Sequence, residues 1–256
     1  MSAPLLQLAQ ATIRFGGLTA VSELTTSVTD NELIGLIGPN GAGKTTAFNM
    51  ITGVYQPTSG TIRFGGQPTA GLKPNELTRL GIARTFQNIR LFSDMTALEN
   101  VMVGRHVRTH SGLLGAIFRT PGFKAEEAAI AQRAQELLDY VGIGKYADFK
   151  ARTLSYGDQR RLEIARALAT DPQLIALDEP AAGMNATEKV QLRELIDQIR
   201  KDNRTILLIE HDVKLVMGLC DRVTVLDYGK QIAEGTPADV QKNEKVIEAY
   251  LGTGGH

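Results

Sequence analysis

The sequence predicts an α/β fold in which a mixed β-sheet carries a mostly helical insertion. A glycine-rich run at residues 38–45 follows a short apolar run, Leu33–Ile37, and precedes residues with helical character, which indicates a strand–loop–helix unit. Further along, Leu174–Leu177 and Thr205–Ile209 are continuous apolar runs, the form that strands take when a parallel sheet buries both faces. Between residues 95 and 168 the pattern is helical instead. These observations indicate one core built from both ends of the chain.

Short strand-like runs separated by turns fill the N-terminal part, up to about residue 86. Glycine pairs at 16–17 and 65–66 and the segment Pro57–Gly60 supply the turns. The strand-like runs are Leu5–Leu8, Thr12–Phe15, Leu33–Ile37 and Gly60–Phe64.

Helical patterns occupy the middle of the chain and the interval between the two later strands. Strong helix formers, with apolar positions three and four apart, extend from Ala125 to Leu138. Val190–Arg200 has the same spacing and completes a strand–helix–strand unit. We therefore expect a single domain over residues 1–256. Its parts are a core at 1–86 and 169–240, a helical subdomain at 87–168, and a C-terminal helix or tail at 241–256.

Composition limits the classes of protein that the chain can represent. With 256 residues, 43% of them hydrophobic and 22% charged, it can form one large core. Lys plus Arg equals Asp plus Glu at 28 each, which disfavours nucleic acid as a partner. The single cysteine, Cys220, excludes an internal disulfide, and no secretory leader is recognisable, so we expect a cytosolic protein. No run approaches the ~18 apolar residues of a membrane span, so contact with a membrane would be through partners.

The glycine-rich run carries the strongest chemical signal. It is Gly38-Pro39-Asn40-Gly41-Ala42-Gly43-Lys44-Thr45, with Thr46 next, and it matches the phosphate-binding pattern G-x-x-x-x-G-K-S/T. Glycines let the backbone wrap around phosphates with its N–H groups turned inward, and the following helix adds a partial positive charge. Lys44 would reach the β and γ phosphates, and the Thr45 hydroxyl would hold Mg²⁺. A nucleoside triphosphate is therefore the expected ligand, and the competing interpretation is a glycine-rich turn that matches by chance.

An apolar strand that ends in acids supplies the partner that such a loop needs. Leu174–Leu177 is followed directly by Asp178 and Glu179. Asp178 can hold Mg²⁺ through water, and Glu179 can polarise the water that attacks the γ-phosphate. Acids at strand ends are usually only solvated, so this interpretation depends on the phosphate loop.

Another segment resembles a known family. It begins Leu154-Ser155-Tyr156-Gly157-Asp158 and ends Ala165-Arg166-Ala167-Leu168. This is similar to the signature segment of ATP-binding-cassette (ABC) ATPases, which begins L-S-G-G-Q and leads into a helix ending A-R-A-L. The segment precedes the Asp178 strand, as in that family, and Phe15, Gln87 and His211 stand in the family's order. The resemblance covers nearly the whole chain and implies a P-loop NTPase core of the ABC type.

The resemblance implies a role for each of these residues, and a purely structural role stays open beside it. Phe15 would stack on adenine, although a lone aromatic usually belongs to the core. Gln87 would touch Mg²⁺ or the attacking water, or would be an ordinary surface residue. His211 would contact the γ-phosphate and orient the water, or would be a core histidine bonded to backbone. ATP and Mg²⁺ are the implied cofactors.

The signature segment also implies a second ATPase subunit. Ser155 and Gly157 precede a helix, where a hydroxyl and backbone N–H groups make an anion site. In the family, this segment faces the ATP held by another subunit, so that ATP joins two cassettes and hydrolysis releases them. Tyr156 and Asp158 replace the family's glycine and glutamine, and Asn185 stands where the family usually has Asp. Because a different partner could compensate for these departures, we expect a heterodimer. The alternative is a homodimer in which they are neutral variations.

Several segments resemble the longer ATPase subunit of bacterial branched-chain amino-acid importers. They are Arg84–Phe92, Leu154–Gly157, Glu179–Asn185 and an extra segment around His106–Lys124. This resemblance implies ATP hydrolysis coupled to transport, at the cytoplasmic face of the inner membrane. It also implies membrane permeases, a related ATPase and, indirectly, periplasmic binding proteins as partners, with Ile89–Val103 forming a groove for a permease helix. These residues do not reveal the transported solute.

Other functions are compatible with parts of the pattern. The ATPase of another transporter, such as a lipid or polysaccharide exporter, would share every catalytic residue. A soluble cassette protein that acts on ribosomes or DNA would carry a second cassette or a long coiled coil, and the neutral charge of this chain disfavours it. The signature segment and His211 argue against an unrelated phosphate-loop kinase.

Overall fold

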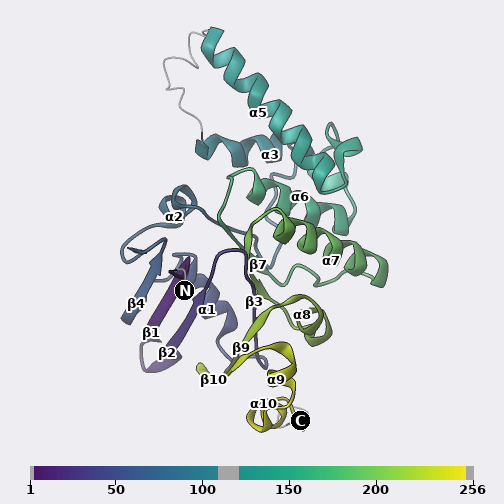
Figure 1. Ribbon diagram of the computed structural model, residues 1–256. Helices are drawn as coiled ribbons and strands as arrows, with labels where there is room; N and C mark the ends of the chain where they lie inside the picture. Colours follow the sequence, from purple (N-terminus) through teal and green to yellow (C-terminus); the bar gives the residue numbers. More distant parts are fainter. Residues whose placement is uncertain (1–2, 109–120, 252–256) are drawn as a thin grey trace.

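A computed structural model describes residues 3–108 and 121–251. Over these residues the strands form a 10-stranded sheet in the order β5-β4-β1-β2-β10-β9-β3-β8-β7-β6 (Figure 1). The strands are β1 (Leu6–Phe15), β2 (Leu18–Val28), β3 (Leu33–Ile37), β4 (Ser59–Phe64), β5 (Gln67–Pro68), β6 (Ile82–Arg84), β7 (Leu174–Asp178), β8 (Thr205–Ile209), β9 (Arg222–Asp227) and β10 (Lys230–Gly235).

The strands around β3 are parallel and buried on both faces. Strands β9, β3, β8, β7 and β6 pair in parallel, while β5, β4, β1 and β2 pair antiparallel, as do β9 and β10. In β3, Leu33 and Ile37 belong to one hydrophobic cluster, and Ile34 and Leu36 belong to another. Successive side chains of a strand point to opposite faces, so the core lies on both sides of the sheet. The mixed sheet agrees with the prediction.

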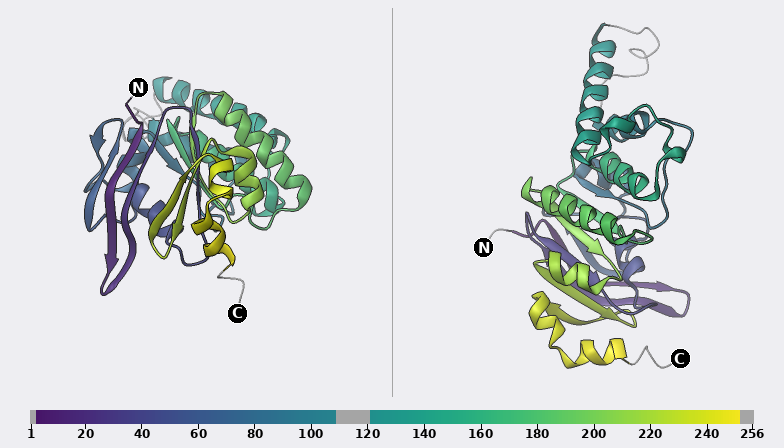
Figure 2. Two further views of the ribbon diagram at one scale, coloured as in Figure 1. Left: turned by 60° about the horizontal axis from the view of Figure 1, so that its bottom comes forward. Right: turned by 90° about the vertical axis from the view of Figure 1, so that its right-hand side faces the viewer.

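The helices divide between the sheet and a separate helical part. They are α1 (Lys44–Ile51), α2 (Pro74–Leu80), α3 (Ala97–Arg105), α5 (Pro121–Tyr140), α6 (Tyr156–Leu168), α7 (Ala186–Lys201), α8 (Val213–Leu219), α9 (Pro237–Gln241) and α10 (Glu244–Leu251). Helix α3 packs against α5 and α6 at one end of the molecule, and α9 and α10 lie at the other end beside β10 (Figures 1 and 2). The helical pattern predicted between residues 95 and 168 corresponds to α3, α5 and α6.

The N-terminal strands differ from the prediction because both contain bulges. The runs Leu5–Leu8 and Thr12–Phe15 are not two strands but one, β1, whose register with β2 shifts near Gln10, a residue with φ of 50°. In β2, Glu23 has φ of 51°, and the fully buried positions are Val21, Leu24 and Val28. A bulge inserts an extra residue and breaks the alternation of period two. The sequence analysis missed β2 for this reason.

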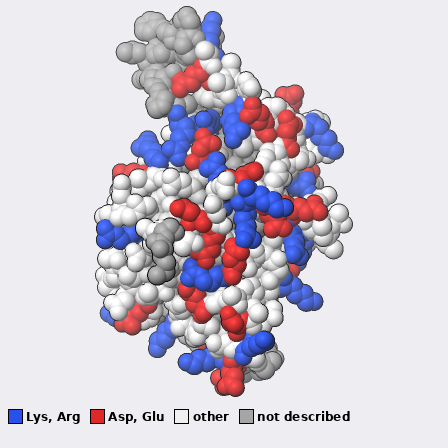
Figure 3. Space-filling view, viewed as in Figure 1, with Lys and Arg blue, Asp and Glu red and all other residues white. Residues whose placement is uncertain are grey.

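Parts of two predicted segments lie outside the described residues. Of the extra segment predicted around His106–Lys124, residues 109–120 lie outside the described residues, as do 252–256 of the C-terminal tail. Within residues 3–108 and 121–251, no helix combines the length and the apolar character needed to cross a bilayer. On the face shown in Figure 3, basic and acidic side chains are interspersed, as expected for equal numbers of both.

Candidate active site

The glycine-rich loop connects the carboxyl end of β3 to the start of α1. Gly43 has φ of 95°, and a Cβ added to it would lie 2.6 Å from the carbonyl oxygen of Ala20. At Gly38 an added Cβ would lie 2.1 Å from the carbonyl oxygen of Leu226. Only glycine fits both positions, because neighbouring strands pass so close to the loop. The sheet therefore holds the loop in its curved shape.

Lys44 lies beneath the loop instead of pointing into solvent. Its Nζ donates to the carbonyls of Gly38, at 2.7 Å, and Pro39, at 2.9 Å, and the residue is 5% exposed. Burial lowers the pKa of Lys44, while the negative charge of Glu179 acts in the opposite direction. No side chain caps α1 and its first turn contains no acid. Its N–H groups and the nearby ammonium therefore provide the positive potential that phosphate groups require.

A cavity of 570 Å³ opens above this loop and collects residues from distant parts of the chain. Gln87, Glu179 and His211 lie in the segments that follow β6, β7 and β8, so three neighbouring parallel strands bring these residues to one edge of the sheet. Ligands of open α/β sheets bind at this carboxyl edge. The residues that line the cavity are Leu18, Thr19, Ala20, Asn40, Gly41, Ala42, Gly43, Lys44, Thr45, Thr46, Gln87, Glu179, His211, Tyr228 and Gly229.

Glu179 is held between two other candidate catalytic residues. Its Oε2 accepts from Gln87 Nε2 at 3.1 Å, and its Oε1 lies 2.5 Å from His211 Nε2. The residue is 6% exposed and has φ of 47°, a left-handed conformation that is unfavourable for glutamate. Strained backbone of this kind is concentrated at functional sites. The structure thus brings together three residues that the sequence placed far apart.

Asp178 carries a buried oxygen that lacks a donor. The residue is 2% exposed, and its Oδ1 has no hydrogen-bond partner among the described residues. Burial, followed by the charge of Glu179, raises the pKa of Asp178 to about 6, against the opposing charges of Arg84, Arg160 and His211. Asp178 does not line the cavity itself, but it is the last residue of β7 and precedes Glu179, which does. An unpaired buried carboxylate oxygen at this place fits a hard cation such as Mg²⁺. Within the described part of the chain, no group of three or more His, Cys, Asp or Glu could hold a metal alone, so phosphate oxygens would have to complete the site.

Glu210 was not among the predicted site residues, although it lies beside them. It is 3% exposed, and its carboxylate accepts from the backbone N–H of Ala181 at 2.7 Å and from that of His211 at 3.2 Å. It therefore ties the segment after β7 to the segment after β8. The sequence Glu210-His211 at the end of an apolar run was the available signal, because an acid there can bind backbone on both sides.

The predicted adenine-stacking residue, Phe15, lies near the cavity without lining it. Its ring is 45% exposed and meets Tyr55 edge to face, with centroids 5.2 Å apart. The residues after its turn, Leu18–Ala20, form the rim instead, together with Tyr228 and Gly229 from the turn between β9 and β10. The rim residues of this turn could have been found from the Tyr-Gly dipeptide between two apolar runs.

The segment Leu154–Asp158 forms the start of α6 and does not line the same cavity. Ser155 is the N-cap: its Oγ accepts from the N–H of Asp158 at 3.2 Å and donates to the Asp158 carboxylate at 2.8 Å. Gly157 is the second residue of α6, so the expectation that it precedes the helix was wrong, whereas Ser155 does precede it. Tyr156 is 43% exposed, while Leu154 is buried. The nucleotide cavity of this chain is therefore formed without this segment.

Comparisons with known proteins agree with this geometry. The model of the family described as ABC transporter matches residues 21–182. The chain belongs to the ABC transporter family. A second model, described as branched-chain amino acid ATP-binding cassette transporter, matches residues 230–256.

Individual relatives of this ABC protein cover almost its full length. The high-affinity branched-chain amino acid transport ATP-binding proteins LivG of Escherichia coli (strain K12) and BraF of Pseudomonas aeruginosa are each 47% identical over 253 residues, which is 98% of this chain and 99% of theirs. The crystal structure of an ATP-binding cassette of an ABC transporter in its ADP conformation superposes with a TM-score of 0.85 at 31% identity, covering 98% of this chain and 100% of the other. The predicted family and ABC-type fold are confirmed, and with them an ATPase that binds ATP.

Proposed function

We propose that this chain is the ATP-binding and ATP-hydrolysing subunit of an ABC importer for branched-chain amino acids, and that hydrolysis drives the movement of membrane permeases. The observation that carries the proposal is the meeting of Glu179, Gln87 and His211 over the phosphate loop, in a chain this similar to branched-chain amino acid transport proteins. The proposal retains the division into a core at 1–86 and 169–240, a helical subdomain at 87–168 and a tail at 241–256.

In this proposal the chain performs hydrolysis with residues already in contact. The N–H groups of the loop and of α1 bind the phosphates, and Lys44 adds a positive charge. Glu179 accepts the proton of the attacking water, because it is the carboxylate that opens onto the cavity. Gln87 and His211 hold that carboxylate from two sides and orient the water. Phe15 stacks on adenine at the edge of the site.

Thr45, Asp178 and Gln87 are the residues that would hold Mg²⁺. When bound, the ion would neutralise charge on the phosphates. The orphaned Oδ1 of Asp178 supports this role, since a buried carboxylate oxygen is otherwise costly. Gln87 would also have to exchange its bond to Glu179 for one to the ion.

The position of the signature segment outside the cavity supports a partner subunit. Because Leu154–Asp158 does not line the cavity of its own chain, we propose that it binds the ATP of a second, different ABC ATPase. Asn185 has a structural role that weakens one argument for this: its Oδ1 accepts from the N–H of Glu188 at 3.0 Å as the N-cap of α7. The heterodimer therefore depends on Tyr156 and Asp158 and on the family relationship.

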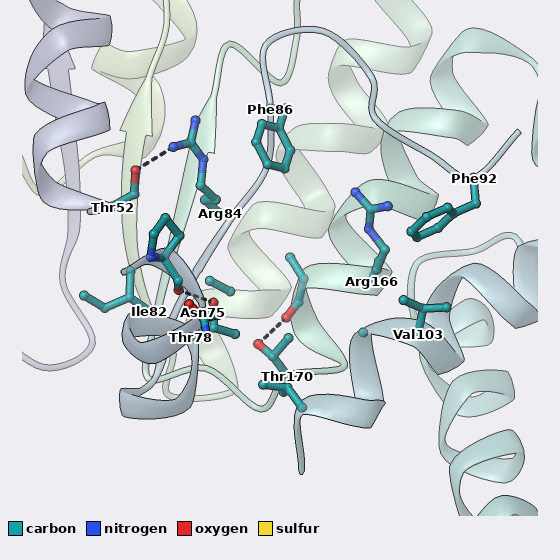
Figure 4. Close-up of a pocket in the computed structure, with 15 residues that line it drawn as sticks. Thr52, Asn75, Thr78, Ile82, Arg84, Phe86, Phe92, Val103, Arg166 and Thr170 are labelled. Carbon is teal, nitrogen blue, oxygen red and sulfur yellow. Dashed lines mark hydrogen bonds between the residues drawn. The ribbon is translucent and has the colours of Figure 1, made fainter. Parts of the chain in front are cut away.

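A groove between the core and the helical part is the proposed site for the permease. It has a volume of 350 Å³ and lies between α2, β6, α3 and α6 (Figure 4). Phe86, Phe92 and Val103 give it an apolar wall, and Arg84 and Arg166 add charge. Phe92 is 49% exposed, whereas Leu91 packs against the core. Of the two positions predicted for this contact, Phe92 is thus the one available to a partner.

The proposed role also implies a location in the cell. It would lie on the cytoplasmic face of the inner membrane, bound to permeases, and would meet a periplasmic binding protein only through them. The proposal includes no nucleic acid as a partner.

The test is to express the chain with its neighbouring permeases, with and without a second ABC ATPase, and to weigh the purified complex. The proposal expects one copy of each ATPase, and uptake of leucine, isoleucine or valine by the reconstituted complex. Full transport with two copies of this chain would exclude the heterodimer and leave the ATPase assignment intact. Association with the permeases of a lipid or polysaccharide exporter would contradict the importer.

A further inference from the structure

One buried arginine of α6, the helix that the signature segment begins, binds the backbone of the loop that carries Gln87. Arg160 is 3% exposed, and its Nη1 donates to the carbonyl of Phe86 at 2.7 Å. Its Nη2 donates to the carbonyl of Gln87. Phe86 lines the proposed permease groove, and Gln87 lines the nucleotide cavity. One guanidinium therefore fixes the backbone at the junction of the two sites.

A buried acid completes this attachment. Glu163, 1% exposed, accepts from Arg160 Nη1 at 3.2 Å and from the backbone N–H of Arg90 at 3.2 Å. Burial raises the pKa of Glu163, against the attraction of Arg160 and the hydrogen bond from Arg90. A buried ion pair contributes little net stability, because desolvation offsets the attraction. Its position is better explained by what the pair holds, namely both sides of the loop between β6 and α3.

The same guanidinium reaches the signature segment. Arg160 Nη2 donates to the Tyr156 hydroxyl at 2.9 Å and lies 5.4 Å from the centroid of that ring. From the other side of the loop, Gln87 Nε2 donates to Glu179. A continuous chain of contacts thus joins Tyr156, Arg160, Gln87 and Glu179. Tyr156, a departure from the signature of the family, takes part through its hydroxyl.

We propose that Arg160 is a positioning residue, which fixes the backbone of Gln87 so that the side chain of Gln87 reaches Glu179 and the nucleotide cavity, and which links this backbone to the signature segment. The inference rests on the catalytic roles proposed for Gln87 and Glu179. Its physical basis is the planar fork of arginine, whose two terminal nitrogens reach both carbonyls, the tyrosine and Glu163 at once. A lysine keeps the charge opposite Glu163 but cannot make this set of bonds.

The experiment measures kcat and KM for ATP in the assembled transporter for Arg160→Lys, Gln87→Ala and the double variant. Arg160→Lys should lower kcat by about 10- to 100-fold, the usual effect of a displaced catalytic group, with KM within about twofold. In the Gln87→Ala background it should lower kcat by less than about twofold, because the two residues act as one unit. The matched control is Arg193→Lys, which replaces another arginine that donates to a backbone carbonyl, that of Gly218 at 2.8 Å. It should leave kcat unchanged.

The outcomes separate the inference from the proposed function. If Gln87→Ala lowers kcat but Arg160→Lys does not, or if Arg160→Lys has the same effect in both backgrounds, the positioning role is overturned alone. If Gln87→Ala itself leaves kcat unchanged, the catalytic role proposed for Gln87 and the positioning role of Arg160 are both contradicted. Should Arg160→Lys not fold, the pair Arg160→Met with Glu163→Met replaces the ion pair by side chains that a core tolerates. That double variant should still have a lower kcat than the parent, and the backbone amides of residues 85–92 should exchange hydrogen faster. Unchanged exchange over these residues would refute the inference.

Discussion

Replacing Glu179 by Gln removes a base while preserving the shape of a side chain that is held on both sides. The amide oxygen can still accept from Gln87, which lies 3.1 Å away, and the amide nitrogen still faces His211 Nε2. The geometry is therefore kept and the proton acceptor is lost. A positioned general base contributes about 10²- to 10⁴-fold to a rate. This corresponds to about 3–5 kcal/mol in the activation free energy.

The assay compares ATP turnover by the reconstituted transporter with ATP binding by the same preparation. Glu179→Gln should bind ATP as the parent does and turn it over at least about a hundredfold more slowly. Glu210→Gln is the matched control, because Glu210 is equally buried but both its oxygens accept from backbone N–H groups. That change should lower the free energy of unfolding by about 1–3 kcal/mol and reduce turnover far less. Parent-like turnover by Glu179→Gln would refute the assignment of the base.

The remaining predictions concern the groove, the pH dependence of stability and a helix cap. Phe92→Asp should abolish co-purification with the permeases and spare ATP binding, because a buried unpaired charge disrupts an interface by several kcal/mol; loss of solubility or of ATP binding would instead make Phe92 a core residue. Burial raises the pKa of Glu32, but hydrogen bonds from Arg222 and Thr29 and the charge of Arg222 outweigh it and lower the pKa below its ordinary 4.5. Glu32→Gln should therefore reduce the free energy of unfolding by about 1.5–3 kcal/mol above pH 4.5, and the difference should vanish as acid protonates Glu32; a difference independent of pH in denaturant titrations would contradict this. Asn185→Ala should lower the free energy of unfolding by about 1 kcal/mol and Asn185→Asp should not, whereas equal stability of all three forms would show that the cap is unimportant.

The central part of the site was predictable because its residues follow strands that the sequence marks clearly. Asp178 and Glu179 follow the apolar run Leu174–Leu177 directly, and His211 comes two residues after the run Thr205–Ile209. Parallel strands place their carboxyl ends at one edge of the sheet. The role of Lys44 was predictable from the local pattern of the phosphate loop alone. These predictions needed only the order of the strands and no detail of packing.

The features that the sequence analysis missed depend on irregular backbone or on contacts between distant elements. Strand β2 was missed because the bulge at Glu23 spaces its buried residues three and four apart, as in a helix. The attachment of Gln87 by Arg160 arises only when α6 packs beneath the loop after β6. By contrast, the N-cap at Asn185 could have been predicted from the sequence, since Asn followed three residues later by Glu188 is a capping-box pattern.

Uptake of radiolabelled leucine into proteoliposomes that contain the assembled transporter tests the central claim most directly. Binding protein and leucine are supplied on one side and ATP on the other, and the parent complex is compared with the Glu179→Gln complex. The account predicts ATP-dependent uptake by the parent that isoleucine and valine inhibit, and none by the variant. Uptake at the parent rate by the variant, or no ATP-dependent uptake of any branched-chain amino acid by the parent, would contradict it.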